Sequence, residues 1–396
     1  MTLLKSVLHL LLIAAALPSA TGGDVPCRVL ELRPGPGNPR NSEGDFALLK
    51  DGSILYVYSH FVDGKGGDHD SAYLASRLSR DGGRTWTEKS EPVVANDAGM
   101  NVMSVSFLRK KDGALALFYA RKNSLSDCRP VMRISHDEGK SWSDARECIP
   151  ESEKGYYVLN NSRVCRLNSG RIVLPLCFHE TKDGKFTDFF GKIVCYFSDD
   201  DGETWKRTRD CFATGDEKGL RVTTQEPGLI ELKDGTVLMY VRTTHGRQWQ
   251  YKSSDGCETW TRGEPGPLIS PLSPASIRRL ANGDLVAVWN DHETYPEMKK
   301  GPRWSNGFRV PLTIGVSRDE GRTWWPRRTL ESNPKGFYCY PAILELDGYL
   351  LVGYCAENEL RHSRITRVPL DWLYGKGEDV PETYDPTFAR RSFFTD

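Results

Sequence analysis

Apolar and polar positions alternate along this chain in short runs, and each run is interrupted near its middle by an Asp-Gly, Asn-Gly or Ser-Gly pair. Six such runs occur, at residues 46–59, 106–120, 164–178, 228–243, 277–291 and 342–356. A period of two predicts half-buried β-strands, and a glycine pair between two strands predicts a tight hairpin turn. The turn glycines are Gly52, Gly113, Gly170, Gly235, Gly283 and Gly348. Their recurrence at about 60 residues suits one four-stranded antiparallel sheet per repeat.

A second motif, S-x-D-x-G-x-T/S-W, falls between these hairpins, and we call it the Asp box. It occurs at residues 79–86, 135–142, 198–205 and 317–324, with a fifth copy at 253–260 that carries Cys257 in place of the glycine. The aspartate can accept hydrogen bonds from its own turn, the glycine permits a positive φ, and the tryptophan offers a large apolar surface between sheets. We therefore interpret the box aspartates as structural and not as catalytic.

Together the repeats predict an all-β fold, namely a six-bladed β-propeller of four-stranded antiparallel blades with Asp-box turns. Strands from residues 27–32 and 364–373 are expected to complete the last blade and so leave no free sheet edge. Because each blade buries its faces against its neighbours, residues 24–396 are predicted to form a single domain.

The N-terminal residues 1–23 contain one lysine, an apolar run at 7–17 and then small residues, which is the layout of a secretory signal peptide. The mature protein is therefore predicted to be secreted or periplasmic. The apolar run is too short to cross a bilayer, and we expect no membrane anchor.

Charge and cysteine content limit the partners, metals and cofactors that the chain is expected to bind. The chain has 53 basic and 53 acidic residues with no long run of one sign, so no nucleic-acid partner is expected. No CxxC or Cys/His spacing indicates a metal, and neither a metal nor a cofactor is expected. The pairs Cys128/Cys148 and Cys195/Cys211 flank Asp boxes, where disulfides and free thiols are open alternatives. We expect a monomer.

The path of the chain through a blade predicts where functional side chains gather. The glycine turns and the Asp boxes share one face, so the beginnings of the first and third strands and the end of the second lie on the other face, where functional loops are expected. The charged and aromatic residues at these positions are Arg40, Asp68, Asp70, Glu226, Arg242, Arg309, Tyr338 and Tyr340. Less definite roles fall to Glu43, Asp45, Asn160, Asn161, Arg163, Asn290, Asp291 and Glu357.

In the order and spacing of these residues, nearly the whole mature chain resembles the sialidase superfamily. The segment 225–242 resembles that family's glutamate strand followed by its second arginine, and the segment 309–313 resembles its third-arginine segment. Arg40 stands where the first arginine is expected, Asp68 where the acid/base aspartate is expected, and residues 340–348 resemble the tyrosine segment.

The resemblance implies an exo-acting retaining glycoside hydrolase, above all an exo-α-sialidase that releases terminal sialic acid from glycoconjugates. It implies that Tyr340 is the nucleophile, that Glu226 takes the tyrosine proton, and that Asp68 protonates the leaving oxygen. Asp70 in place of Asp68 and Tyr338 in place of Tyr340 remain alternatives, since the glycine-rich stretch 63–70 could shift the aspartate by two residues and each tyrosine is one residue off the expected spacing.

These residue types suit an acidic sugar as the partner. Sialic acid carries a carboxylate on its anomeric carbon, and Arg40, Arg242 and Arg309 could hold it through charge-assisted hydrogen bonds. The same carboxylate disfavours an anionic nucleophile, which explains a tyrosine activated by a glutamate. Further contacts to the substrate are expected from Asn161 and Arg163. Glu357 is expected to orient Arg40 from the adjoining blade.

Two departures from the family's pattern lie at the expected substrate site. At the first arginine, the segment Arg40-Asn-Ser-Glu-Gly-Asp45 replaces the family's usual R-I-P, and Tyr338-Cys-Tyr-Pro341 replaces the usual Tyr-Ser. A changed set of substrate contacts can alter the sugar that is accepted. Two alternatives therefore stay open: a propeller glycosidase acting on another acidic sugar, and a non-catalytic propeller that binds carbohydrate.

Overall fold

A computed structural model describes residues 25–212, 221–300, 307–356 and 362–375. This part of the chain consists mainly of β-strands. Its helical segments are α1 (Leu370–Tyr374) and two short 3-10 turns at Glu151–Glu153 and Pro296–Lys300. The all-β class predicted from the period-two pattern is therefore confirmed.

Four of the sheets contain four antiparallel strands each. The first has the order β2 (Arg40–Leu48), β3 (Ile54–Phe61), β4 (Ala72–Ser79) and β5 (Glu91–Val94). The second has β17 (Thr224–Glu231), β18 (Val237–Thr243), β19 (Arg247–Ser253) and β20 (Glu264–Ile269). The third has β21 (Ser276–Arg279), β22 (Leu285–Trp289), β23 (Leu312–Ser317) and β24 (Arg327–Glu331). The fourth has β25 (Cys339–Leu346), β26 (Tyr349–Ala356), β27 (His362–Pro369) and β1 (Cys27–Leu32).

A larger, nine-stranded sheet holds two more hairpin and Asp-box repeats. One repeat supplies β6 (Asn101–Arg109), β7 (Leu115–Ser124), β8 (Asp127–Ser135) and β9 (Arg146–Glu147). The other supplies β11 (Cys165–Arg166), β12 (Ile172–His179), β15 (Lys192–Ser198) and β16 (Lys206–Phe212). The repeats are joined by β10 (Tyr156–Val158), which pairs antiparallel with β12 and through one parallel pair with β8. A separate hairpin is formed by β13 (Thr181–Lys182) and β14 (Lys185–Phe186).

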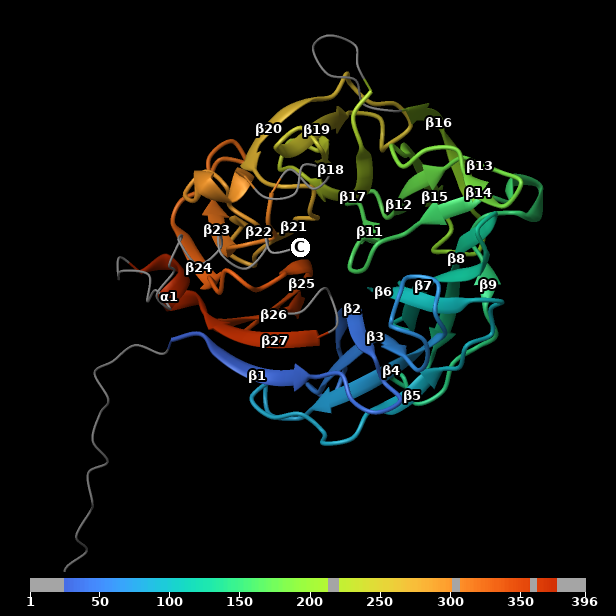
Figure 1. Cartoon of the computed structure of the whole chain (residues 1–396), viewed down its shortest axis with the longest axis horizontal. Coiled ribbons are helices and arrows are strands. Elements are labelled where there is room, and N and C mark those ends of the chain that lie inside the picture. Colours follow the sequence, from blue (N-terminus) through green and yellow to red (C-terminus); the bar gives the residue numbers. More distant parts are fainter. Residues whose placement is uncertain (1–24, 213–220, 301–306, 357–361, 376–396) are drawn as a thin grey trace, which may run out of the picture.

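The sheets are arranged around a common centre, with β2, β6, β11, β17, β21 and β25 nearest to it (Figure 1). The two ends of the described chain meet in one sheet, where Cys27 of β1 is opposite Arg367 of β27. This pairing confirms the predicted use of the N-terminal strand. The second predicted strand ends earlier than expected, because the chain turns at Pro369 into α1.

Hairpins and Asp boxes have the predicted local structure. All six turn glycines have positive φ angles, for example 83° at Gly52 and 92° at Gly170. In the box at 135–142, the Asp137 carboxylate accepts hydrogen bonds from the Ser135 hydroxyl at 2.8 Å and from the Ser141 N–H at 2.9 Å. The carboxylate is thus used within its own turn, which confirms the structural interpretation. Cys257 adopts a φ of 76° in the place that glycine holds in the other boxes.

Turns and boxes lie on the same face of the molecule. The Lys50 N–H, in one glycine turn, donates a 3.0 Å hydrogen bond to Glu138 in the box of the next repeat. The same contact joins Lys111 to Asp201 and Lys233 to Glu320. The opposite strand ends therefore form the other face, as the chain path predicts.

Apolar clusters fill the space between neighbouring sheets. In one of them Val57 and Leu74 pack against Val105 and Leu117 of the next repeat. Their complete burial gives the inner strand ends a rigid scaffold.

The expectations about cysteines, export, membrane spans and metals have different outcomes. Cys128 and Cys148 are free thiols in different apolar clusters, so the bridge considered between them is wrong. The Cys211 side chain and the predicted signal peptide lie outside what the structure describes, so export stays a prediction. Within the described ranges, no helix has the length and apolar character needed to span a bilayer, and no three His, Cys, Asp or Glu side chains cluster as metal ligands.

Candidate active site

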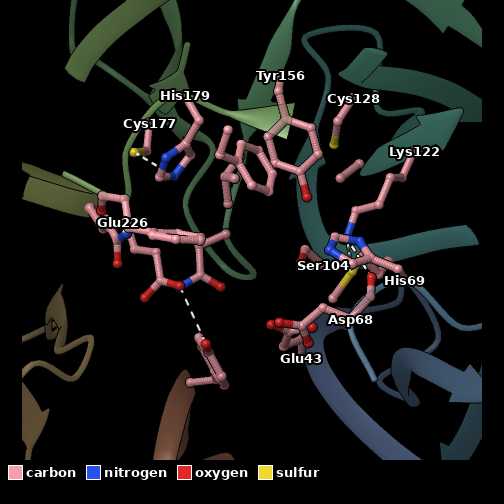
Figure 2. A pocket seen from close by; sticks show the side chains of 18 of the residues that line it. Glu43, Asp68, His69, Ser104, Lys122, Cys128, Tyr156, Cys177, His179 and Glu226 are labelled. Atoms are coloured by element: carbon pink, nitrogen blue, oxygen red, sulfur yellow. Dashed lines mark hydrogen bonds between the residues drawn. The ribbon is translucent and has the colours of Figure 1, made fainter. Parts of the chain in front are cut away.

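A cavity of about 270 Å³ opens among the inner strands. Charged and polar side chains from several sheets line it, including Glu43, Asp68, Ser104, Lys122, Glu226, Arg242 and Tyr340. Figure 2 shows Glu43 and Asp68 on one side of this cavity and Glu226 across from them. Residues far apart in the sequence thus meet on the face opposite the Asp boxes.

Four of the lining residues, Glu43, Ser104, Glu226 and Tyr340, occupy equivalent places in their strands. Each immediately precedes or lies within a β-bulge of an innermost strand, and their φ angles are 53°, 64°, 50° and 56° respectively. A positive φ in a non-glycine residue is strained, and such strain is concentrated at functional sites. The bulge thus presents one side chain from each of four repeats to the cavity.

The sequence analysis did not identify this bulge position, although the spacing of its residues from the turn glycines indicates it. Glu43, Ser104 and Glu226 each stand nine residues before their turn glycine, and Tyr340 stands eight before Gly348. Alignment of the repeats on their turn glycines therefore identifies the position.

Tyr340, Glu226 and Arg242 form a hydrogen-bonded chain. The Tyr340 hydroxyl donates to Glu226 Oε1 at 3.3 Å, and Arg242 Nη1 donates to Glu226 Oε2 at 2.5 Å. Burial and the Glu226 carboxylate raise the pKa of Tyr340 well above its usual value, against the opposing effect of Arg242 and Arg309. The phenol is therefore neutral and adjacent to a carboxylate that can accept its proton.

Arg40 and Asp68 form a second charged pair. Arg40 is only 3% exposed, and its Nη1 donates to Asp68 Oδ1 at 2.6 Å. Burial works against the Arg40 charge, but the Glu43 and Asp68 carboxylates raise its pKa. The Asp68 side chain is 62% exposed, and although desolvation opposes it, the charge and hydrogen bond of Arg40 hold the Asp68 pKa below the usual value. Asp68 is therefore ionised when the cavity holds no ligand.

Arg309 lies over the Tyr340 ring, with its guanidinium carbon 5.8 Å from the ring centroid. It is buried, and its Nε and Nη1 groups have no hydrogen-bond partner among the described residues. Arg242 Nε and Arg40 Nη2 likewise lack a hydrogen-bond partner in that part of the chain. Buried donors without acceptors are costly, so an anion bound among these groups would satisfy them.

The structure distinguishes the paired alternatives by position. Asp70 Oδ2 accepts hydrogen bonds from the Lys65 and Gly67 N–H groups at 2.9 and 2.8 Å, so this carboxylate shapes its own loop. Tyr338 is packed in an apolar cluster. Asp68 and Tyr340, by contrast, line the cavity.

Two residues expected to bind substrate, Asn161 and Arg163, lie outside the lining of the cavity. Asn161 Nδ2 donates to the carbonyl oxygen of Tyr340 at 3.1 Å, and Arg163 Nη2 donates to the Ala275 carbonyl at 2.6 Å. Neither lines the cavity, whereas the neighbouring Asn160 does. Their donors hold backbone between repeats, so the structure does not bring them to the cavity, and their contact with substrate stays a prediction. Glu357 lies outside the described residues.

The cavity also contains groups that sequence reasoning missed. Lys122 lies near the end of β7, where the chain-path argument applies, and its Nζ donates to the Asp68 carbonyl at 2.6 Å. The Cys177 thiol and the His179 Nε2 are 3.3 Å apart. Burial raises the pKa of Cys177 to about 12 and lowers the pKa of His179 to about 4, so both are neutral and Cys177 is not an activated nucleophile.

Comparison with known proteins supports the repeat assignment. Residues 75–352 match the model of the BNR repeat-like domain. The chain belongs to the BNR repeat-like domain family, within the sialidase superfamily. This BNR repeat-like protein is 26% identical over 258 residues to the anhydrosialidase of Macrobdella decora, which covers 59% of this chain and 30% of that protein. It is 24% identical over 358 residues to a sialidase of Bacteroides fragilis, which covers 81% of this chain and 60% of that protein.

The BNR repeat-like protein thus spans less than two thirds of either curated relative. Among solved structures, a protein of unknown function from Dyadobacter fermentans matches with a TM-score of 0.66 and 18% identity over 87% of this chain and 99% of that one. A leech intramolecular trans-sialidase matches with a TM-score of 0.67 and 14% identity over 90% of this chain and 72% of that one. At these identities the structural matches show the fold alone.

Proposed function

We propose that this protein is an exo-acting retaining glycoside hydrolase that releases a terminal acidic sugar, with sialic acid as the first candidate. The observation that carries this proposal is the neutral Tyr340 hydroxyl hydrogen-bonded to Glu226 at 3.3 Å, beside three buried arginines with unpaired N–H groups. Arg242 lines the cavity, Arg40 binds Asp68 of the lining, and Arg309 lies over Tyr340 of the lining.

These positions support the following reaction as part of the proposal. Tyr340 attacks the anomeric carbon while Glu226 takes the phenolic proton, and Asp68 protonates the departing oxygen. Water then cleaves the tyrosyl-sugar bond, with Asp68 taking a proton from the water and Glu226 returning the proton to Tyr340. Both steps displace a group at the same carbon, so the anomeric configuration is retained.

Asp68 must become protonated before it can act as an acid. Its ionised state in the free protein depends on Arg40. A sugar carboxylate bound to Arg40 competes for that guanidinium and adds negative charge near Asp68. Both effects raise the Asp68 pKa, so substrate binding itself prepares the acid.

We also propose that the fold is a closed propeller of six blades. The nine-stranded sheet then counts as two blades connected by β10, and the pairing of β1 with β27 completes the ring. The six glycine turns and the arrangement of sheets around a centre in Figure 1 support this count.

The test is hydrolysis of a fluorogenic sialic acid glycoside by the purified chain. Tyr340→Phe is expected to lower kcat by about a thousandfold, as is typical for loss of a covalent or proton-transfer group. Tyr338→Phe is the matched control and should retain activity, because Tyr338 packs in an apolar cluster. Equal loss in both variants would contradict the assignment.

Glu43 favours a second candidate, a glycosidase for a different acidic sugar. It places a third carboxyl group in the cavity beside Arg40. Activity on a uronic acid glycoside, with none on the sialoside, would support this candidate. Binding of acidic sugars without turnover of any glycoside would show a carbohydrate-binding protein.

A further inference from the structure

Glu43 lines the cavity, and the reaction proposed above does not use it. It stands at the strand position that Glu226 and Tyr340 occupy in their own repeats, with a strained φ of 53°. In Figure 2 its side chain lies near Asp68, across the cavity from Glu226. A strained residue directed into a functional cavity calls for a functional explanation.

The surroundings of Glu43 are strongly charged. The side chain is 6% exposed, and its Oε2 lies 3.6 Å from Arg40 Nη2 and 3.4 Å from the Ser42 hydroxyl. The other titratable groups that act on it or respond to it come from five further elements: Asp68 in the β3–β4 loop, Lys122 on β7, Glu226 on β17, Tyr340 on β25 and Cys355 on β26. Burial raises the Glu43 pKa to about 7, although Arg40 opposes the rise.

Arg40 connects Glu43 to ligand binding. Arg40 Nη1 is occupied by Asp68, whereas Nη2 has no hydrogen bond and its nearest carboxylate is that of Glu43. An ionised Glu43 competes with a sugar carboxylate for Nη2, and it also repels that carboxylate. A protonated Glu43 does neither, so it leaves Nη2 available for the ligand.

The charge balance of the cavity leads to the same conclusion. Four cations, Arg40, Lys122, Arg242 and Arg309, stand against three carboxylates, Glu43, Asp68 and Glu226. One proton on Glu43 therefore raises the net charge of this set from one to two positive charges, which favours an anionic sugar.

We propose that Glu43 is a positioning residue that couples the binding of an acidic sugar to the uptake of one proton. The carboxyl group is neutral in the complex and ionised in the free protein at alkaline pH, and the proton comes from the solvent. This proposal rests on the proposed function, because it assumes that the cavity binds a sugar carboxylate.

The experiment is calorimetric titration of the full chain with a 2,3-didehydro sialic acid between pH 5 and 9, repeated in buffers of different ionisation enthalpy. We expect the wild type to take up close to one proton per ligand above pH 7, with affinity falling by up to tenfold per pH unit there. Glu43→Gln should bind with an affinity that changes little in this range and without that uptake. The proton count of the wild type tests the proposal even where the variant folds poorly.

Asp45→Asn is the matched control. Asp45 is also a buried carboxyl on the same bulge, but it accepts a hydrogen bond from the Phe107 N–H and does not line the cavity. Its variant should keep the pH slope and the proton uptake of the wild type. Proton uptake by Asp68 is separable, because it persists in Glu43→Gln, whereas the uptake by Glu43 is lost there.

One outcome would contradict the role of Glu43 alone, and another would contradict the proposed function as well. A Glu43→Gln protein with the pH slope and proton uptake of the wild type overturns the role of Glu43 and leaves the proposed function standing. Absence of both binding and hydrolysis at every pH, for sialic and uronic acid ligands alike, overturns the proposed function and this inference with it.

Discussion

The buried Glu43 carboxyl also makes a prediction about folding that requires no ligand. Burial raises its pKa from the ordinary 4.5 to about 7 in the folded protein. Unfolding exposes the group, so the folded chain holds more protons than the unfolded chain between these two values. The contribution of Glu43 to the free energy of unfolding is therefore greatest at acidic pH and falls as the pH rises toward 7. Glu43→Gln removes the titrating group, so this pH-dependent loss of stability is absent from the variant.

The magnitude follows from the two pKa values. At about 1.4 kcal/mol for each tenfold change in proton affinity, ionisation of Glu43 costs about 3 kcal/mol at pH 8 and about 1 kcal/mol at pH 5. The free energy of unfolding of the wild type should therefore fall, relative to that of Glu43→Gln, by about 2–3 kcal/mol between pH 5 and pH 8. For a chain of 396 residues this corresponds to about 3 °C in Tm.

The assay is thermal or urea unfolding of both proteins at pH 5, 6, 7 and 8 at constant ionic strength. All other titrating groups are shared, so the difference between the two curves isolates Glu43. Curves that stay parallel within about 0.5 kcal/mol would refute the reasoning, because they would show that Glu43 ionises as freely in the folded as in the unfolded chain.

Other changes test the remaining parts of the site and scaffold. Arg309→Ala is expected to raise KM for an acidic glycoside by about 10- to 100-fold with little change in Tm, and Arg309→Lys should rescue it poorly, as kinetics and melting curves will show. Asp137→Ala should lower Tm while the folded fraction keeps its specific activity, because this carboxylate bonds only within its own turn. Asn161→Ala leaves the Tyr340 and Gly44 carbonyls without their donor; a loss of about 1–3 kcal/mol in urea unfolding and a lower kcat are expected.

Much of the fold and part of the site could be predicted from local sequence patterns. Hairpin turns need a residue that tolerates positive φ, so Gly52 and its five counterparts mark the turns directly. The boxes are equally local, since Asp137 bonds to residues within its own turn. The chain path then placed Asp68 and Tyr340 on the face opposite the boxes, because the direction of each strand follows from its turn.

Contacts between distant segments could not be predicted in this way. The short strand β10 joins two repeats through residues that carry no repeat signal. Arg163 has the chemistry of a ligand-binding residue, but its guanidinium reaches Ala275 and not the cavity. Lys122 lies near a strand end like the predicted residues, yet only the folded chain brings its ammonium group to the Asp68 backbone.

The sequence by itself determined the strands, the turns, the Asp boxes and the face opposite the boxes on which the cavity lies, because each depends on a few neighbouring residues and on the alternation of side chains along a strand. Only the tertiary structure distinguished the positions of Asp68 and Tyr340, which line the cavity, from those of Asp70 and Tyr338, which do not. Two residues separated by one position point to the same side of a regular strand, and it is the bulge between Cys339 and Ala342 that turns Tyr340 into the cavity. Only the tertiary structure also placed Glu43 against Arg40 and within reach of Asp68, since the charge of a buried carboxyl depends on groups that other repeats supply.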